Sequence, residues 1–228
     1  MGSIIFDQRE ITSLEASEYD ELWAKGWRHF GSYFFRYNLT IHQGEICRVL
    51  PLRIRLANYQ HRKSHRKILR RAKNFKVVHK PLEVTEEMVG LFERHKKRFQ
   101  DNVPDSIEVF LSDAPEIPRL PMECSIYDQG RLIAVSFFDE SVDACSSIYG
   151  MFDLDYGKYS LGTLTMLEEI NYALRKGKDF YYHGYCYDVS SFYDYKKHFP
   201  ALEAYNWNDT WFEYGPDINL PSELDEYL

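Results

Sequence analysis

Long apolar runs and a secretion signal are both missing from this sequence. No stretch approaches the roughly 18 apolar residues that cross a bilayer, and the start MGSIIFDQRE has neither the basic nor the apolar region of a signal peptide. We therefore expect a cytoplasmic protein that has no membrane partner.

Cysteine is scarce and irregularly placed. The four cysteines, Cys47, Cys124, Cys145 and Cys186, form no CxxC pair and no Cys/His cluster at zinc spacing. Each lies in an apolar or aromatic stretch, which is typical of a small buried side chain. The sequence therefore predicts free thiols and no structural metal.

Acidic residues are absent from one long segment. Between Arg48 and Lys80 there are twelve lysines and arginines and no Asp or Glu, although the whole chain has a net charge of -7. The rest of the chain has 16 basic and 35 acidic residues. This separation of charge predicts one basic face on an otherwise acidic molecule. Only the basic face would attract polyphosphate, because an acidic surface repels it.

The composition is otherwise that of a globular protein. With 228 residues, 44% of them apolar and 16% aromatic, the chain can fill one sizeable core or two small ones packed together. No repeat, low-complexity segment or linker separates its two halves.

Hydrophobic patterning in the first half predicts helices and strands in alternation. Thr85 is placed to cap a helix, and Arg62, Arg66, Arg70 and Lys73 recur at spacings that put them on one helix face. Three prolines predict a loop over 101–121. The predicted elements are a helix at 15–27, strands at 27–41 and 47–59, and helices at 61–75 and 86–99.

The second half is richer in strands. The turn Asp128-Gln129-Gly130 predicts a hairpin, and the neighbouring strands are expected to pair antiparallel. Gly177 is expected to end a long helix that starts at Ser160. The predicted elements are strands at 122–140 and 143–152, a helix at 160–177, a strand at 179–187, a short helix at 190–199, one or two strands at 201–214 and a loosely held tail at 217–228.

Four segments, at 19–37, 50–75, 128–170 and 180–207, resemble the aminoacyl-tRNA-protein transferases, in both their arginyl and leucyl branches. The most specific parts are Arg53-Ile54 followed by the helix with Lys63 to Arg66, and the stretch with Asp153, Asp155 and Ser160 to Gly162. Gly184-Tyr185 and Tyr195-Lys196 before Phe199-Pro200 add weaker support. The resemblance covers most of the chain.

The resemblance implies a fold of the α/β (α+β) class. It is a GNAT-like mixed sheet, mostly antiparallel and flanked by helices, with a smaller N-terminal subdomain. We expect that subdomain, with the basic helix, over 1–80, and the acyltransferase domain over 81–228, packed together without a flexible linker. Members of the family usually carry a cysteine cluster before the Arg-Ile strand. This chain has only Cys47 there, so the iron-sulfur or regulatory function of that cluster is not expected.

The implied reaction is attack by a protein α-amine on the aminoacyl ester of charged tRNA. Positioning dominates such a reaction, because an α-amine with a pKa of about 7.7 to 8 is partly neutral near pH 7. No covalent triad is needed, so the absence of a GxSxG or Cys-His signature does not exclude an enzyme. No cofactor is expected besides aminoacyl-tRNA as co-substrate.

The start of the helix at Ser160 and Gly162 is the first candidate site, since unpaired amides there can stabilise an oxyanion. The structural alternative is that Ser160 caps the helix and Gly162 eases helix-strand packing. Other candidates for catalysis or substrate contact are Glu123, Lys196, Tyr185, His183 and Asp188. Most of the tyrosines around them are expected to be core residues, although some can stack on the terminal adenosine of tRNA.

The basic segment is the second candidate site, for tRNA phosphates or for an acidic N-terminal residue of the protein substrate. A run of cations without an acid repels itself unless an anion compensates it. The candidate residues are Arg53, Arg62, Lys63, His65, Arg66, Lys67, Arg70 and Arg71.

We therefore expect transfer of an amino acid to a protein N-terminus, most simply an acidic one. Arginine is preferred over leucine as the donor, because the remaining chain is acidic. One alternative is a GNAT-like transferase that uses acyl-coenzyme A, for which the stretch around Gly157 and Gly162 lacks the compact glycine motif. Another alternative is a non-catalytic module that binds RNA or protein.

Overall fold

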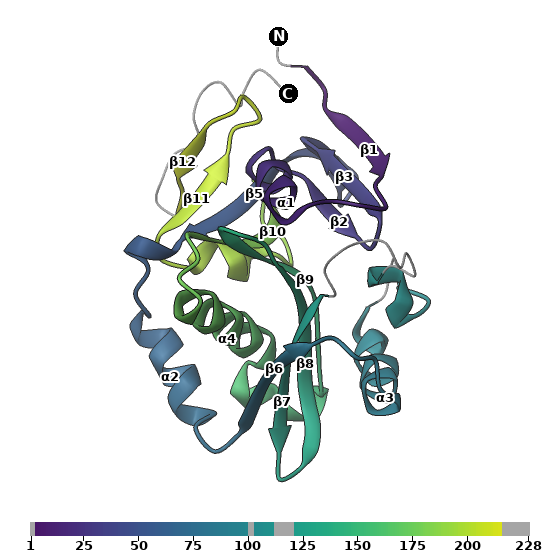
Figure 1. The fold of residues 1–228 in the computed structure, drawn as a ribbon, viewed down its shortest axis with the longest axis vertical. Helices are drawn as coiled ribbons and strands as arrows, with labels where there is room; N and C mark the ends of the chain where they lie inside the picture. The colour runs from purple at the N-terminus through teal and green to yellow at the C-terminus, as the bar shows by residue number, and fades with distance from the viewer. Residues whose placement is uncertain (1–2, 100–102, 112–120, 216–228) are drawn as a thin grey trace.

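The computed structural model describes residues 3–99, 103–111 and 121–215. In this part of the chain, a nine-stranded sheet forms the centre of the molecule and a three-stranded sheet lies beside it (Figure 1). The predicted fold class, a mixed and mostly antiparallel sheet flanked by helices, is confirmed. No helix in the described ranges has the length and apolarity needed to cross a membrane.

The small sheet is built from the N-terminal segment, in the order β1 (Phe6–Glu10), β3 (Tyr33–Tyr37) and β2 (Arg28–Phe30). Helix α1 (Ala16–Ala24) packs on it through Tyr19 and Trp23. A single strand was predicted over 27–41, but Gly31 has a φ of +56° and turns the chain between β2 and β3. Strand β1 was not predicted, because its sequence FDQRE is polar and exposed.

The large sheet has the order β12-β11-β5-β10-β9-β8-β7-β6, with β4 paired to β5 off this path. Neighbouring strands are antiparallel except β9 and β10, which are parallel. The strands are β4 (Leu39–His42), β5 (Glu45–Arg55), β6 (Lys76–Pro81), β7 (Met122–Asp128), β8 (Arg131–Glu140), β9 (Ala144–Phe152), β10 (Phe180–Tyr187), β11 (Leu202–Tyr205) and β12 (Trp211–Glu213).

Strands β5 and β6 come from the predicted N-terminal subdomain, yet they pair within the same sheet as the later strands. The division into a subdomain over 1–80 and a domain over 81–228 stays a prediction. Strand β6 was not predicted, because its polar residues disguise the alternation; it pairs antiparallel with β7 from Lys76 to Pro81.

Helices cover both faces of the large sheet (Figure 1). Helix α4 (Leu161–Arg175) packs on one face, and helix α2 (Lys63–Arg71) packs on α4 through Ile68 and Leu69. Helix α3 (Glu86–His95) packs on the other face, where Met88, Leu91 and Phe92 meet β8 and β9. The hydroxyl oxygen of Thr85 accepts a hydrogen bond from the Met88 amide at 3.3 Å, so the predicted cap is confirmed.

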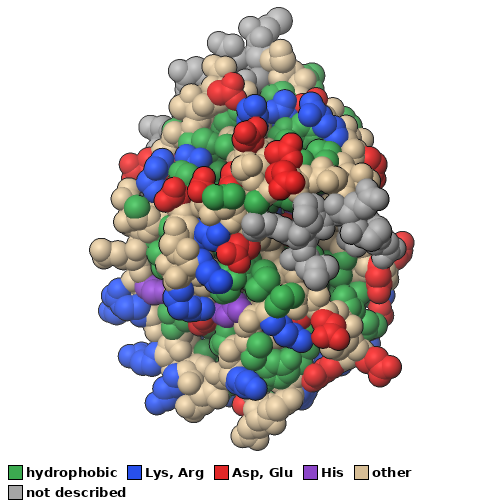
Figure 2. All heavy atoms as spheres, in the orientation of Figure 1, with side chains coloured by type: hydrophobic (Ala, Val, Ile, Leu, Met, Phe, Trp, Pro, Cys, Tyr) green, Lys and Arg blue, Asp and Glu red, His purple; other side chains and the backbone are tan. Residues whose placement is uncertain are grey.

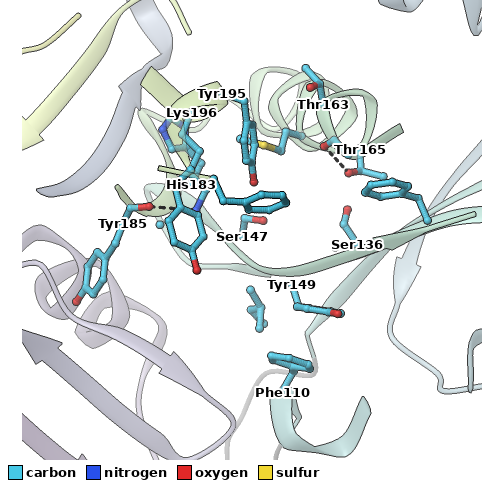
Figure 3. A pocket seen from close by; sticks show the side chains of 18 of the residues that line it. Phe110, Ser136, Ser147, Tyr149, Thr163, Thr165, His183, Tyr185, Tyr195 and Lys196 are labelled. Carbon is cyan, nitrogen blue, oxygen red and sulfur yellow. Dashed lines mark hydrogen bonds between the residues drawn. The ribbon is translucent and has the colours of Figure 1, made fainter. Parts of the chain in front are cut away.

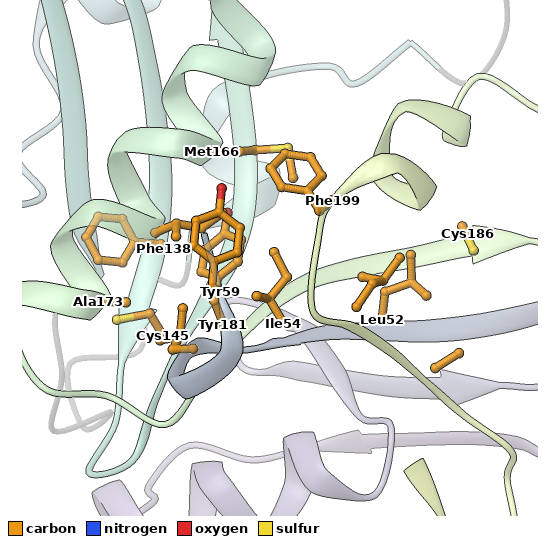
Figure 4. Close-up of a cluster of buried hydrophobic side chains, with 14 of the residues drawn as sticks. Leu52, Ile54, Tyr59, Phe138, Cys145, Met166, Ala173, Tyr181, Cys186 and Phe199 are labelled. Carbon is orange, nitrogen blue, oxygen red and sulfur yellow. The ribbon is translucent and has the colours of Figure 1, made fainter. Parts of the chain in front are cut away.

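The main core lies between α4 and the sheet. Figure 4 shows Phe138, Cys145, Met166 and Tyr181 packed together there. All four cysteines are free and buried, as predicted, and burial raises the pKa of each thiol. They are small core side chains rather than reactive ones.

Short 3-10 turns complete the described chain: η1 (Leu56–Asn58), η2 (Lys96–Arg98), η3 (Ile107–Phe110), η4 (Leu154–Tyr159) and η5 (Asp194–His198). Turn η3 lies inside the predicted loop at 101–121, where Ile107 and Phe110 are buried among apolar neighbours. The prolines of that loop at 115 and 118, and the predicted C-terminal tail at 217–228, lie outside the described residues.

Candidate active site

A central cavity opens where two strands of the large sheet separate. Strands β9 and β10 pair only from Ala144 to Ser146 and from Phe180 to Tyr182. Beyond these residues they diverge, and a cavity of about 690 Å³ lies in the gap. Ser147 to Gly150 of β9 and His183 to Tyr185 of β10 line it. The divergence exposes backbone and side chains that a continuous sheet would bury.

A β-bulge accompanies the divergence on each strand. Along β10, Tyr182 and Gly184 pair with adjacent residues of β5, so His183 is the extra residue. Along β9, Ile148 is the extra residue opposite Phe137 and Phe138. A bulge bends its strand and redirects side chains, and it is common beside active sites. His183 therefore lines the cavity (Figure 3).

Aromatic side chains form much of the cavity wall. Phe110 and Tyr149 stack with ring centroids 3.9 Å apart, and Phe30 meets Phe110 edge to face at 5.1 Å. Phe35 and Phe152 extend the same wall. Such a surface suits an apolar group of a substrate.

Two cations enter the cavity from different elements. Arg28 of β2 donates from Nη1 to Ser146 Oγ at 2.7 Å and from Nη2 to the Ser147 carbonyl. Lys196 of η5 donates from Nζ to the Tyr185 carbonyl at 3.3 Å. No described Asp or Glu forms an ion pair with either of them. Burial lowers the pKa of Arg28, and burial together with the charge of Arg28 lowers the pKa of Lys196 to about 7.

His183 adds a neutral polar group next to these cations. Its exposed fraction is 2%, and neither ring nitrogen has a hydrogen-bond partner among the described residues. Burial, followed by the charges of Lys196 and Arg28, holds its pKa well below the usual value. The imidazole is therefore neutral at pH 7, and both of its nitrogens are available to a ligand.

A buried carboxylate lies beneath the cavity. Glu169 of α4 is fully buried and accepts a hydrogen bond from the Tyr181 hydroxyl at 2.6 Å. Burial raises its pKa to about 7, an effect that the nearby hydroxyls of Ser136 and Tyr181 partly offset. Ser136 also lines the cavity, so Glu169 lies next to a residue of the cavity wall without lining the cavity itself.

The start of α4 borders the cavity as well. Ser160 adopts the left-handed conformation, with φ 53° and ψ 51°, and its side chain forms no capping hydrogen bond. Ser160 therefore occupies the N-cap position, where its carbonyl accepts from the Leu164 amide at 2.9 Å, but its side chain does not cap the helix. The amides of Leu161, Gly162 and Thr163 have no acceptor among the described residues, and these residues line the cavity. They form a group of donors that can stabilise an anionic oxygen.

Gly162 also has a packing role, as the structural alternative stated. A Cβ at this position would lie 3.0 Å from Cε1 of Phe152, so the ring of Phe152 rests directly on the first turn of α4. A substitution at Gly162 therefore moves an aromatic wall of the cavity, and it does not isolate the contribution of the backbone amides.

The structure brings together five of the predicted residues: Ser160, Gly162, His183, Tyr185 and Lys196 all line the cavity. The hydroxyl of Tyr185 donates to the Gly26 carbonyl at 2.6 Å, which ties β10 to the segment after α1, and burial holds its pKa well above the usual value.

Two predicted residues lie elsewhere. Glu123 of β7 is fully buried, accepts from the Ser125 hydroxyl at 2.8 Å and does not line the cavity. Asp188 forms an ion pair with Arg48 at 2.6 Å. Both carboxylates have structural partners, so the geometry does not support their proposed part in catalysis.

The basic segment is divided by the fold. Six of its predicted residues are exposed on and before α2, and Figure 2 shows Lys and Arg side chains gathered over this helix. They are Arg62, Lys63, Arg66, Lys67, Arg70 and Arg71. Arg71 donates to the Lys158 carbonyl at 3.3 Å, which links α2 to η4 at the cavity edge.

The other two predicted basic residues are buried and do not belong to this face. His65 packs on Phe199 at 4.7 Å, and burial lowers its pKa to about 4. Arg53 pairs with Glu203 at 2.6 Å and lies over the rings of Phe180 and Trp211. Neither side chain is available to a phosphate.

Arg28, Arg98 and Glu169 were not predicted from the sequence. Arg98 lies over Phe192 at 4.5 Å and over Phe152 at 5.2 Å, at the cavity wall. Arg28 is one charge in an ordinary strand pattern, while Glu169 beside Glu168 and Arg98 after Lys96 and Lys97 resemble the charged residues of an ordinary helix surface. The one available signal is that Arg28 and Glu169 fall inside segments that carry the family resemblance.

Replacing Lys196 with methionine is expected to stabilise the fold below pH 7 by about 1 to 3 kcal/mol, because it removes a desolvated ammonium. The pKa of Lys196 is about 7 when folded, against a usual 10.5. Between these values the unfolded state binds more protons, so native stability rises with pH and the gain from the substitution shrinks. Urea denaturation at pH 6 and pH 9 measures this, and an equal gain at both pH values would contradict it.

Comparisons with known proteins give two family matches that together span most of the chain. The family described as "Arginine-tRNA-protein transferase, N terminus" matches residues 3–67, and the one described as "Arginine-tRNA-protein transferase, C terminus" matches residues 87–206. The two matches together cover every residue that lines the cavity, and they include α2 up to Lys67.

Similar curated proteins carry one name, "Aspartate/glutamate leucyltransferase". The protein from Campylobacter jejuni is 27% identical over 179 residues, which cover 73% of this chain and 70% of that protein. The protein from Helicobacter hepaticus is 24% identical over 207 residues, covering 88% and 84%. The protein from Pseudoalteromonas atlantica is 27% identical over 212 residues, covering 89% and 90%.

Solved structures show more distant similarity. L-PGS from Bacillus licheniformis aligns with a TM-score of 0.47 and 12% identity, covering 63% of this chain and 47% of that one. A GCN5-related glucosamine N-acetyltransferase region of a fungal GH3 β-N-acetylglucosaminidase aligns with a TM-score of 0.41 and 12% identity, covering 83% and 22%.

Proposed function

The chain belongs to the arginine-tRNA-protein transferase family, and from that premise we propose that it transfers leucine from charged tRNA to a protein that begins with Asp or Glu. The observation that carries this proposal is the position of the cavity. It lies between the diverging strands and the free amides of α4, while the basic helix α2 lies on the outer side of α4.

The choice of leucine departs from the preference for arginine based on overall charge. The cavity wall is aromatic, and the two cations inside it repel a guanidinium. The names of the similar bacterial proteins point in the same direction. Arginine is the second candidate donor.

We propose that the acceptor stem of tRNA binds along α2 and that its 3′ end passes η4 into the cavity. The exposed cations of α2 face solvent without an ion-pair partner among the described residues, and Arg71 contacts the backbone of η4. Phosphates neutralise such a row of charges. Phe192, which is 62% exposed beside Arg98, is placed to stack on the terminal base.

In the proposed reaction, the α-amine attacks the ester carbonyl, the new C–N bond forms and the ester C–O bond breaks. The amine loses a proton, and the released ribose oxygen gains one. The amides of Leu161, Gly162 and Thr163 stabilise the oxyanion between these steps. Roughly a tenth of an α-amine is neutral at pH 7, so a strong base is unnecessary. We propose that aminoacyl-tRNA is the sole co-substrate and that the reaction occurs in the cytoplasm.

Transfer of radiolabelled leucine or arginine from purified charged tRNA to synthetic peptides tests this proposal. Peptides begin with Asp, Glu, Lys or Arg, and a peptide with an acetylated N-terminal Asp is the control, because it has no free α-amine. We expect label from leucyl-tRNA in the Asp and Glu peptides alone. Label from arginyl-tRNA would make arginine the donor.

Two other results would contradict the proposal. Absence of label with every pair, despite tRNA binding, would favour the non-catalytic alternative. Transfer from acyl-coenzyme A to the same peptides would favour the GNAT-like acyltransferase. Binding of tRNA is measured in parallel as a function of tRNA concentration. Saturable binding then distinguishes these outcomes from a loss of activity caused by misfolding.

A further inference from the structure

Arg28 and Lys196 converge on one point in the cavity. A Cβ built on Gly184 would lie 2.9 Å from Lys196 Nζ and 4.0 Å from Arg28 Nη2. Gly184 has a φ of +97°, which only glycine adopts without strain, and the absence of a side chain keeps this space open. Two like charges thus meet at a place that the backbone leaves empty.

The contacts within the chain do not neutralise these charges. Arg28 donates to one hydroxyl and one carbonyl, and Lys196 donates to one carbonyl. A guanidinium has five donors and an ammonium has three, so most of them have no described partner. Asp139 and Glu169 act on Arg28 electrostatically, but Asp139 is held by His29 at 2.7 Å, and neither carboxylate forms a described ion pair with Arg28 or Lys196. Desolvated cations without an ion-pair partner lower stability, and they are retained where a ligand supplies the charge.

His183 completes this end of the cavity. It follows the parallel pairing on β10, and the charges of Lys196 and Arg28 both act on it. Its ring nitrogens are unpartnered among the described residues, and it lies beside Lys196 in Figure 3. A neutral imidazole accepts or donates one further hydrogen bond without adding charge.

A carboxylate fits this arrangement better than a phosphate of tRNA does. The cations lie inside an aromatic cavity on the sheet, whereas a separate row of exposed cations lies on α2, on the other side of α4. A carboxylate has two oxygens that arginine and lysine can share, in a group small enough to enter beside Gly184.

We propose that Arg28 and Lys196 together bind the side-chain carboxylate of the acceptor's N-terminal residue, with His183 as an additional hydrogen-bonding group. This rests on the proposed function, and it assigns acceptor selection to the cavity and not to the basic helix. Arg28 comes from the small N-terminal sheet and Lys196 from η5, so the specificity site is assembled from both ends of the chain.

The test compares peptides that begin with Asp and with Asn, which differ by one charge. The ratio of their kcat/KM values is measured for the native protein and for Arg28→Gln and Lys196→Met. We expect each substitution to lower the Asp/Asn ratio by about 10- to 100-fold, mainly through loss of the Asp reaction, because a hydrogen bond to a charged group is lost. The ratio is insensitive to the fraction of folded protein, since both peptides meet the same sample.

Arg36→Gln and Lys197→Met are the matched controls. Arg36 pairs with Asp7 and Lys197 pairs with Asp194, and neither lines the cavity. We expect both controls to keep the native ratio. An unchanged ratio in both cavity variants, with transfer still measurable, would overturn the proposal.

Equilibrium binding separates the remaining outcomes. If a cavity variant loses all transfer, binding of the same two peptides is measured without tRNA; loss of the preference for Asp supports the proposal, and a retained preference overturns it. If the native protein transfers neither leucine nor arginine to any peptide but still binds Asp over Asn through these residues, the proposed function fails and the carboxylate site stands.

Discussion

Replacing Arg66, Lys67, Arg70 and Arg71 with glutamine is expected to lower the affinity for tRNA by about three orders of magnitude near 0.15 M salt. All four side chains are exposed on α2. Each phosphate contact releases condensed counterions, and at this salt concentration each release contributes about a factor of five. The logarithm of affinity should therefore fall less steeply with the logarithm of salt concentration, by roughly three to four units of slope.

A second variant controls for net charge. Arg9 of β1, Lys25 just after α1, Arg94 of α3 and Lys97 of η2 are exposed, and their replacement with glutamine changes the charge by the same amount. We expect this variant to lose less than about tenfold in affinity, through long-range attraction alone. Filter binding or fluorescence anisotropy at several salt concentrations measures both variants. Equal losses would mean that tRNA does not bind along α2.

Replacing Glu203 with alanine is expected to destabilise the fold by about 3 kcal/mol, because it leaves a buried guanidinium unpaired. Arg53 Nε lies 2.6 Å from one oxygen of Glu203, and Arg55 Nε lies 2.7 Å from the other. The side chains of Arg53 and Glu203 are 9% and 14% exposed, so we expect a loss of stability at the lower end of the range for broken buried ion pairs. Urea denaturation at pH 7 measures the change in the free energy of unfolding.

The same variant also tests the role of Arg53. The sequence indicated Arg53 as a contact for tRNA, whereas the structure places its guanidinium over Phe180 at 4.0 Å and over Trp211 at 4.2 Å. We expect unchanged tRNA affinity under conditions where the variant is fully folded. Glu203→Gln is the matched control, because it keeps one acceptor and should lose less stability. A small loss of stability combined with weaker tRNA binding would restore the sequence-based interpretation.

Local patterns were sufficient to predict most of the helices and the antiparallel strands. Apolar periodicity gave α3 and α4 close to their observed bounds, and the turn at Gln129-Gly130 gave the hairpin of β7 and β8. The choice of a GNAT-like sheet depended on family resemblance. Alternation cannot distinguish strand partners, so it could not show that β10 lies between β5 and β9.

The cavity was only partly predictable for the same reason. Ser160 and Lys196 were identified within motifs, but their meeting depends on bulges at Ile148 and His183 that no local signal marks. Arg28 is separated from Ser146 by more than half the chain and looks like an ordinary strand residue. Conversely, Arg53 and His65 were assigned to the basic face by charge alone, although burial among aromatic rings removes them from it.

The parallel pairing that stops at Ser146 and Tyr182 also constrains how the chain folds. Strands β6 to β9 follow one another along the chain and pair in that order, so their pairing with one another needs no residue beyond β9. Strand β5 pairs with β10 and β11, so it must wait for residues more than a hundred positions later. On the ribosome, β6 to β9 can assemble while β5 is paired only with β4 and still lacks β10 and β11. Because Lys196 follows β10, the proposed carboxylate site of Arg28 and Lys196 is complete only when most of the chain has been synthesised.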